Sequence, residues 1–168
     1  MNCPARSILL IGYGNPARAD DGLGPALAEW FERLSLPRLT VDADYQLTVE
    51  DAAEAARHDV VLFADASLNG PEPFWIKRLE PATAGVGFSS HGVQPEAVLA
   101  LARDLFQAEP EGYLVGIRGY DFSMFRSVLT PKAQENLAAA AAYLESALTN
   151  STPLVTAACA DWLADNSL

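Results

Sequence analysis

The chain has 168 residues, half of them hydrophobic and a fifth charged, which is the composition of one globular domain rather than of a disordered segment. Its formal charge of -11, from 22 acidic and 11 basic side chains, disfavours nucleic acids and anionic membranes as partners. No apolar stretch approaches the roughly 20 residues of a membrane-spanning helix, and the first apolar run ends in a glycine turn without a cleavage site for a signal peptide. We therefore expect a cytoplasmic protein in which residues 1–150 form a single domain and residues 151–168 form a tail with a short helix around Trp162.

The first half of the chain alternates apolar strands with amphipathic helices. Ser7–Ile11 is a short branched run that ends at a glycine turn, as expected of a buried parallel strand. Gly22–Leu34 carries apolar residues at three- and four-residue intervals and predicts a helix. The next segments predict a strand at Leu39–Val41, a helix at Thr48–Ala56 with an approximate capping box, and a fully buried strand at Asp59–Asp65.

The second half continues the alternation. Phe74–Leu79 mixes hydrophobic and polar residues after two prolines, which indicates a less buried or edge strand. A helix at Pro95–Gln107, a strand at Tyr113–Ile117 and an alanine-rich helix that begins at Thr130-Pro131 and runs to Leu148 follow. This order predicts an α/β fold: a single-domain three-layer αβα sandwich, with a mostly parallel twisted sheet of about five strands and helices on both faces.

Polar side chains stand at the carboxyl ends of these predicted strands. Asp20 and Asp21 follow the first strand, Asp65 ends the most buried strand, and His91 lies in an SSHG loop before a helix. Because ligands collect where the carboxyl ends of parallel strands meet, we expect these groups to lie together. Two carboxylates and an imidazole suit a divalent first-row metal, and a cation between two like charges keeps both carboxylates ionised.

Each of these residues also has a structural interpretation. An aspartate at the start of a helix commonly caps it, so one of Asp20 and Asp21 can be a cap and the other a ligand. Asp65 can bind the amides of neighbouring loops, and His91 can be a solvated loop residue. His58, which stands between Arg57 and the following strand, is expected on the surface.

The glycine loop also allows a nucleotide-binding interpretation. Gly12–Ala17 satisfies the pattern GxGxxG/A, and Asp42 or Asp44 stands near the second strand, where a ribose-binding acid would lie. Against this, the two acids that follow the loop place negative charge where a pyrophosphate would sit, and the proline of the loop lacks an N–H that a phosphate would need. We favour a cation here and keep a nucleotide-binding Rossmann-like α/β module as the alternative.

Three ordered blocks of sequence resemble a known family. GYGNPARADDGLG is similar to a GxGNxxxxDDGxG signature, YQLTVEDAAEAARHDVVLFADAS to a block that leads to a strand-ending aspartate, and SSHGVQPEAVLAL to a Ser-x-His segment before a helix. GYDFSMFRSVLTPKAQENL is similar to a later segment, although its DFSMFRSVL part is less glycine-rich than the pattern. Over roughly residues 7–148 the chain thus resembles the nickel-iron hydrogenase maturation proteases, endopeptidases that trim the C-terminus of the hydrogenase large subunit after nickel insertion.

The resemblance implies roles for three residues. Asp21, Asp65 and His91 match the nickel-recognising positions of the family, and we take the same three residues as the catalytic and metal-binding set. The implied partner is a hydrogenase large-subunit precursor, and the nickel is carried by this substrate. Two carboxylates and one imidazole lack thiolates, so we expect the protease alone to hold nickel weakly while cysteines of the precursor hold it well.

A mechanism follows from this assignment as a hypothesis. Docking onto the bound nickel would position the scissile peptide, and Asp21, Asp65 or a metal-polarised water would assist hydrolysis. No protein nucleophile is assigned, because Cys3 and Cys159 fall outside the matched motifs. Replacing His91 by alanine is expected to leave the protein folded and to abolish trimming.

Overall fold

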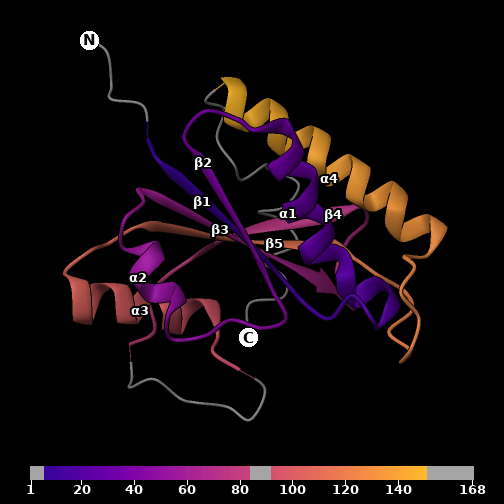
Figure 1. Cartoon of the computed structure of the whole chain (residues 1–168), viewed down its shortest axis with the longest axis horizontal. Coiled ribbons are helices and arrows are strands. Elements are labelled where there is room, and N and C mark those ends of the chain that lie inside the picture. The colour runs from indigo at the N-terminus through magenta and orange to yellow at the C-terminus, as the bar shows by residue number, and fades with distance from the viewer. Residues whose placement is uncertain (1–5, 84–91, 151–168) are drawn as a thin grey trace.

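The computed structural model describes residues 6–83 and 92–150, which form a five-stranded sheet between two helical layers (Figure 1). The elements in chain order are β1 (Ile8–Tyr13), the 3-10 helix η1 (Ala19–Gly22), α1 (Leu23–Leu34), β2 (Leu39–Asp44), α2 (Asp51–Ala55), β3 (Val60–Ser67), β4 (Phe74–Leu79), α3 (Pro95–Phe106), β5 (Glu111–Arg118) and α4 (Pro131–Asn150). The predicted α/β class is confirmed. The expected helix in the tail 151–168 lies outside the described residues.

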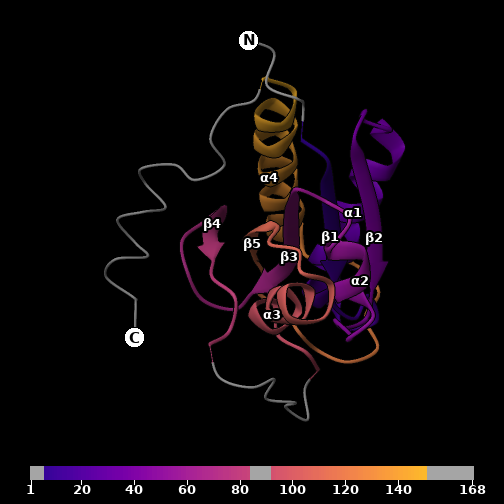
Figure 2. The ribbon, with the colours of Figure 1, turned by 90° about the vertical axis from the view of Figure 1, so that its left-hand side faces the viewer.

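The sheet has the strand order β2-β1-β3-β5-β4. The strands β2, β1, β3 and β5 run parallel, and β4 pairs antiparallel with β5 at one edge, as expected for the less buried strand. Helices α1 and α4 cover one face of the sheet, and α2 and α3 cover the other (Figure 2). The mostly parallel sheet with helices on both faces is therefore confirmed.

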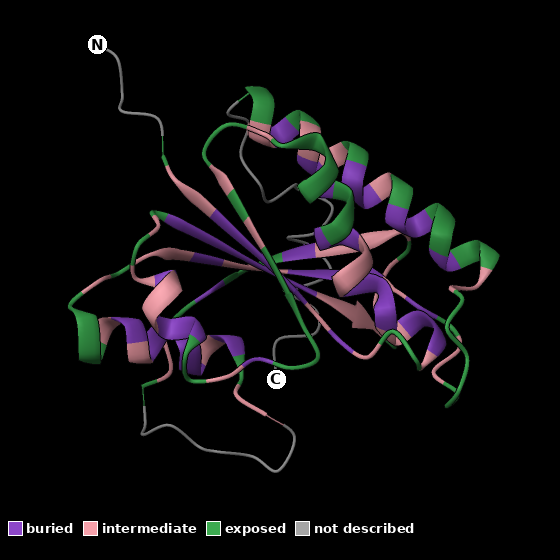
Figure 3. Ribbon diagram, in the orientation of Figure 1, coloured by how far each residue is buried: buried purple, intermediate pink, exposed green. Residues whose placement is uncertain are grey.

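Strand β3, at the centre of the sheet, is deeply buried. The first five residues of β3 are all buried, because α1 and α4 cover one side of this strand and α2 and α3 the other (Figure 3). A strand covered on both faces needs apolar residues at every position, which explains the continuous run VVLFA. None of the helices that the structure describes is both long and apolar enough to cross a membrane.

Several predicted boundaries differ from the observed ones. Strand β2 continues to Asp44, so Asp42 and Asp44 lie within the strand instead of beyond its end. Strand β3 continues to Ser67, so Asp65 lies two residues before its end. The helix expected from Thr48 begins at Asp51, because the Asp51 carboxylate accepts the Thr48 backbone N–H at 2.6 Å and closes a turn ahead of the helix.

The glycines of the first loop allow β1 and the segment Ala19–Gly24 to pack with almost no space between their backbones. A Cβ on Gly12 would lie 2.1 Å from the Gly24 carbonyl oxygen. Gly14 has a φ of +139°, and a Cβ there would lie 2.1 Å from the Asp21 carbonyl oxygen. These glycines therefore bring η1, with its two acids, directly over the carboxyl end of β1.

Gly24→Ala is expected to destabilise the protein by about 3 kcal/mol, because the new Cβ would meet backbone atoms that cannot rotate away. It would lie 2.3 Å from the Tyr13 carbonyl oxygen and 2.4 Å from that of Ala64. Gly22→Ala is the matched control, since its nearest contact is the Pro16 Cα at 3.1 Å. Urea unfolding of the two variants measures the difference, and equal stabilities would contradict the close-packing role.

Candidate functional site

The candidate site is built on one row of register partners, residues that stand side by side on neighbouring strands of the sheet. Asp65 of β3 stands opposite Gly116 of β5, and Gly116 stands opposite Trp75 of β4. Tyr13 at the end of β1 is the next member of the row, because β1 and β3 stay in register up to the preceding pair. Side chains in one row point to the same face, which here is the face covered by α2 and α3.

Asp65 lies in an environment that resists its ionisation. Burial raises the pKa of its carboxyl group to about 6, and the negative charge of Asp21 acts in the same direction. The Ala66 backbone N–H donates to Asp65 Oδ1 at 2.7 Å, and the Tyr13 hydroxyl also donates to this carboxylate; both bonds oppose the rise. Burial in turn raises the pKa of Tyr13, so the phenol remains a donor at neutral pH. Asp65 therefore titrates close to neutral pH.

Asp21 reaches the same edge of the sheet from η1. Its Oδ2 accepts the Asn15 backbone N–H at 3.0 Å and lies 4.0 Å from an Arg18 guanidinium nitrogen. The side chain keeps 23% of its surface exposed, so it remains open to a ligand. Since its charge acts on Asp65, the fold brings together these two predicted acids. The predicted third member, His91, lies outside the described residues.

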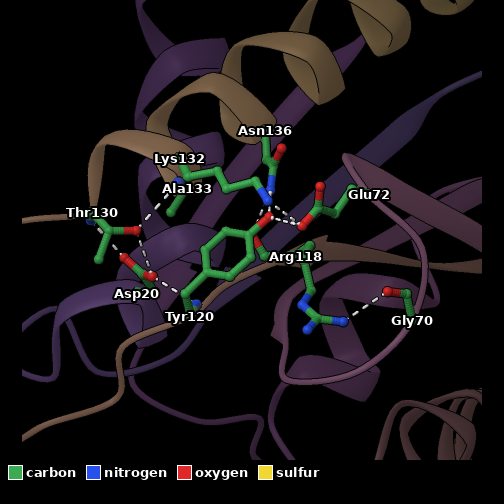
Figure 4. A network of polar contacts seen from close by, with 9 residues as sticks. All are labelled: Asp20, Gly70, Glu72, Arg118, Tyr120, Thr130, Lys132, Ala133 and Asn136. Atoms are coloured by element: carbon green, nitrogen blue, oxygen red, sulfur yellow. Dashed lines mark hydrogen bonds and ion pairs between the residues drawn. The ribbon is translucent and has the colours of Figure 1, made fainter.

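Asp20 has a different role from its neighbour. Its side chain is fully buried and accepts four hydrogen bonds from the segment 119–130, and Figure 4 shows it beside Tyr120 and Thr130. The donors are the backbone N–H groups of Tyr120 at 2.8 Å, Asp121 at 3.0 Å and Thr130 at 2.7 Å, together with the Thr130 hydroxyl at 2.9 Å. Asp20 thus anchors a distant loop and does not cap α1. Of the two adjacent acids, Asp21 is the one available for ligand binding.

A second polar network, which no sequence pattern predicted, continues from this anchor (Figure 4). The Tyr120 hydroxyl donates to Glu72 at 2.6 Å, and Lys132 of α4 binds the same carboxylate oxygen at 2.7 Å. Asn136 donates to the Tyr120 hydroxyl at 2.8 Å, and the Lys132 ammonium lies 4.8 Å from the centre of the Tyr120 ring. The network joins α4 to the loop that follows β3 and to the loop that follows β5.

The expectation for His58 is wrong. Its side chain is only 9% exposed, with Nδ1 at 2.9 Å from the Glu54 carbonyl oxygen and Nε2 at 2.9 Å from the Thr40 hydroxyl. A carbonyl oxygen only accepts, so Nδ1 carries the proton and Nε2 accepts from the hydroxyl. His58 also precedes β3 and therefore lies at its amino end, whereas Asp65 lies near its carboxyl end. It is a structural residue and does not belong to the site.

Within residues 6–83 and 92–150, no group of three histidine, cysteine or acidic side chains is placed to hold a metal ion. Asp21 and Asp65 form a pair of acids in that part of the chain, and a three-ligand metal site there would need a ligand from outside it. The predicted set of Asp21, Asp65 and His91 thus stays a prediction as a complete ligand set.

A cavity of about 330 Å³ opens beside Asp65 on the same face. Its floor is Gly116, where a Cβ would lie 2.2 Å from the Trp75 ring. The Trp75 indole N–H donates to the Ser67 hydroxyl at 3.1 Å, which fixes the ring as one wall. The complete lining is Asp65, Ala66, Ser67, Leu68, Asn69, Trp75, Leu114 and Gly116.

These features define an α/β protein with an acidic site at the carboxyl ends of its central strands. No family model matches the chain, and no curated protein matches it in sequence. Solved structures do match. The [NiFe] hydrogenase maturation protease HycI from Thermococcus kodakarensis KOD1 superposes with a TM-score of 0.68 at 23% identity, over 86% of this chain and 93% of that one.

Two further solved structures agree. The hydrogenase maturating endopeptidase HybD from E. coli has a TM-score of 0.68 and 25% identity, over 86% of this chain and 93% of that one. The hydrogenase 2 maturation peptidase from Thaumarchaeota archaeon SCGC_AB-539-E09 has a TM-score of 0.63 and 21% identity, over 85% and 98%. The chain has the fold of the hydrogenase maturation proteases, and the resemblance seen in its motifs is confirmed.

Proposed function

We propose that this protein is a cytoplasmic endopeptidase that removes the C-terminal extension of a nickel-iron hydrogenase large-subunit precursor after nickel insertion. Asp21, Asp65 and His91 recognise the nickel that the precursor carries. The observation that carries the proposal is the meeting of Asp21 and Asp65 at the strand ends, within the fold of the hydrogenase maturation proteases.

Electrostatics supports a cation at this position. Asp21 and Asp65 are close enough for one charge to resist the other, and burial adds to that resistance at Asp65. A divalent cation between the carboxylates removes both penalties, because it stabilises the two ionised forms together. Nickel bound in the precursor would therefore be recognised most strongly when both acids are deprotonated.

The same groups can assist peptide hydrolysis. In the protein without its substrate the Asp65 carboxyl has a pKa of about 6, so it is mostly ionised at neutral pH and can act as a general base. In this scheme Asp65 takes a proton from a water molecule while the water oxygen attacks the scissile carbonyl carbon. The C–N bond then breaks as the proton passes to the leaving amine, so Asp65 returns to its ionised form. Tyr13 holds the Asp65 carboxylate in position through its hydroxyl.

The nucleotide-binding alternative loses its main support. The loop glycines are accounted for by close contacts within the chain, since the Asp21 carbonyl oxygen occupies the space next to Gly14. The neighbouring Asp21 side chain also places negative charge beside the loop. We expect NAD(H) and ATP to leave the melting temperature unchanged, whereas a bound nucleotide at about 100 times its Kd would stabilise the protein by roughly 2.7 kcal/mol.

The function is tested by mixing the purified protein with nickel-loaded large-subunit precursor and measuring the mass of the product. A shortened precursor is the expected result, and nickel-free precursor should remain intact. Binding of the loaded precursor without shortening would identify a scaffold instead of a protease. Neither binding nor shortening, with precursors of several hydrogenases, would overturn the proposal.

His91→Ala is expected to abolish trimming of the nickel-loaded precursor, because the proposed site would lose its single nitrogen ligand. His58→Ala is the control, since this second histidine lies at the amino end of β3, away from the proposed site. Product mass after a fixed time gives the readout, and circular dichroism checks that both variants are folded. Trimming by His91→Ala at the rate of the unaltered protein would refute the role of this imidazole.

A further inference from the structure

We propose that the cavity between Asp65 and Trp75 is a subsite for an apolar side chain of the precursor, on one of the two residues that flank the scissile bond. The inference rests on the proposed function and adds a substrate preference to it. Five of the lining residues lie outside the sequence blocks that carry the resemblance: Leu68, Asn69, Trp75, Leu114 and Gly116.

Gly116 allows the Trp75 ring to lie flat against the sheet beside the cavity. Gly116 stands between Asp65 and Trp75 in the register row, and both of these side chains line the cavity. The Trp75 ring lies directly over Gly116, because a Cβ there would lie 2.2 to 2.6 Å from the ring atoms. The Ser67 hydroxyl accepts the indole N–H and itself donates to the Asn69 carbonyl oxygen. The wall is thus held in place before any ligand arrives.

The walls of the cavity select for an apolar group. Trp75, Leu68 and Leu114 contribute hydrocarbon surface, and the Leu68 side chain remains 63% exposed at the rim. The Ser67 hydroxyl is already engaged, so it does not call for a polar partner. Leu68 would be withdrawn from water by an entering apolar side chain, which favours binding.

Size and position connect the cavity to the reaction. A volume of about 330 Å³ is at the lower end of ligand pockets, which run from roughly 300 to 1,000 Å³, and it suits one large side chain with its adjoining backbone. Asp65 belongs both to the acidic pair and to the lining of the cavity. An extended peptide advances about 3.3 Å per residue, so a carbonyl beside Asp65 places a neighbouring side chain within reach of the cavity.

The first test varies the substrate. Nickel-loaded precursors that carry Gly, Val, Leu, Phe, Lys or Asp at each residue flanking the scissile bond are compared by kcat/KM. At one of the two positions we expect Val or Leu to exceed Gly, Lys and Asp by about tenfold or more. A preference for Lys would assign the cavity to a cationic side chain attracted by Asp65 and overturn the proposal. Equal rates at both positions would also overturn it.

The second test varies the rim with a matched control. Leu68→Asn should lower kcat/KM for the Leu-containing precursor by about tenfold and leave the Gly-containing precursor nearly unchanged. Leu105→Asn is the control, because Leu105 is also 63% exposed but lies at the far end of α3. The two variants should have equal melting temperatures, since both leucines are largely solvated. Equal kinetic effects of the two substitutions would contradict the subsite.

The third test enlarges the cavity. Trp75→Ala removes one wall, so the optimum should shift from Val or Leu toward Phe in the precursor series. A shift in preference is a ratio within one variant, so it remains measurable even if Trp75→Ala lowers stability and overall rate. An unchanged order of substrates would refute the role of Trp75.

Failure of this inference differs from failure of the proposed function. If the unaltered protein cleaves none of the precursors, the protease assignment is wrong. If it cleaves them all without regard to the flanking side chain, the protease assignment stands and the subsite is refuted.

Discussion

Asp65→Asn is expected to abolish cleavage of the nickel-loaded precursor and, at the same time, to stabilise the folded protein at pH 7.5. The proposed mechanism needs the Asp65 carboxylate as a ligand to the substrate's nickel and as a general base, and an amide serves poorly in both roles. The rate should therefore fall by at least about a hundredfold, the lower range for loss of a general base. Mass spectrometry of the precursor measures it.

The gain in stability follows from the pKa of Asp65. The folded protein holds this proton up to about pH 6, whereas the ordinary value is 3.8. The stability contributed by protonated Asp65 is present below pH 3.8 and is lost as the pH rises through about 6. At 1.36 kcal/mol per pKa unit, the loss reaches about 3 kcal/mol at pH 7.5. Asparagine does not titrate, so Asp65→Asn should be more stable than the unaltered protein at pH 7.5, by up to that amount.

Urea unfolding at pH 7.5 and pH 4 separates this effect from ordinary packing changes. The advantage of Asp65→Asn should shrink as the pH falls, and Asp42→Asn serves as the matched control. Asp42 accepts the N–H of its own neighbour at 2.8 Å, as Asp65 does at 2.7 Å, but it is exposed. A stability gain that does not depend on pH would contradict the assigned cause. The kcat/KM of the unaltered protein should also decline as the pH falls below about 6.

The pattern of apolar and polar residues was sufficient to predict the fold. A central strand that is buried on both faces has to be apolar at every position, whereas an edge strand does not. The run from Val60 to Ala64 could be read as a covered parallel strand, and Phe74–Leu79 as an edge strand, from the polarity of their residues alone. The predicted ends of β2 and β3 come too early in the chain, because the last residues of these strands are polar or exposed while their backbones still pair with neighbouring strands. The polarity of the residues shows where the buried part of a strand ends, but the backbone pairing of the strand extends beyond that point.

The division of roles between Asp20 and Asp21 could not be predicted from their positions. Both acids stand in the same turn, and their difference depends on the segment 119–130, which lies about a hundred residues away in the chain. The pairing of Gly116 with Trp75 could not be predicted for a similar reason. Their contact depends on the antiparallel register between β4 and β5, which no local pattern encodes. Sequence signals of this kind identify the strands and leave their long-range partners undetermined.

Asp20→Ala is expected to destabilise the protein by about 4 kcal/mol at neutral pH. It would remove a buried carboxylate that accepts three backbone N–H groups and one hydroxyl, and each buried donor left without an acceptor costs about 1 to 3 kcal/mol. Asp121→Ala is the control in the same loop, because that carboxylate binds Ser123 and Arg126 near the surface. Its loss should cost much less than that of Asp20, because ion pairs near the surface contribute little. Comparable losses in urea unfolding would contradict the anchoring role.

The pH dependence of Asp20→Ala should have the opposite sign to that of Asp65→Asn. Burial alone would raise the pKa of Asp20, but the hydrogen bonds from Thr130, Asp121 and Tyr120 outweigh burial and lower it. The stability that Asp20 contributes is therefore present above its ordinary pKa of 3.8 and is lost as the pH falls through the lower, folded value. The difference between Asp20→Ala and the unaltered protein should be largest at neutral pH and decrease below about pH 4. Two aspartates near the carboxyl ends of the parallel strands would then respond to acid in opposite directions, because hydrogen bonds dominate the pKa of Asp20 whereas burial and the nearby charge of Asp21 raise that of Asp65.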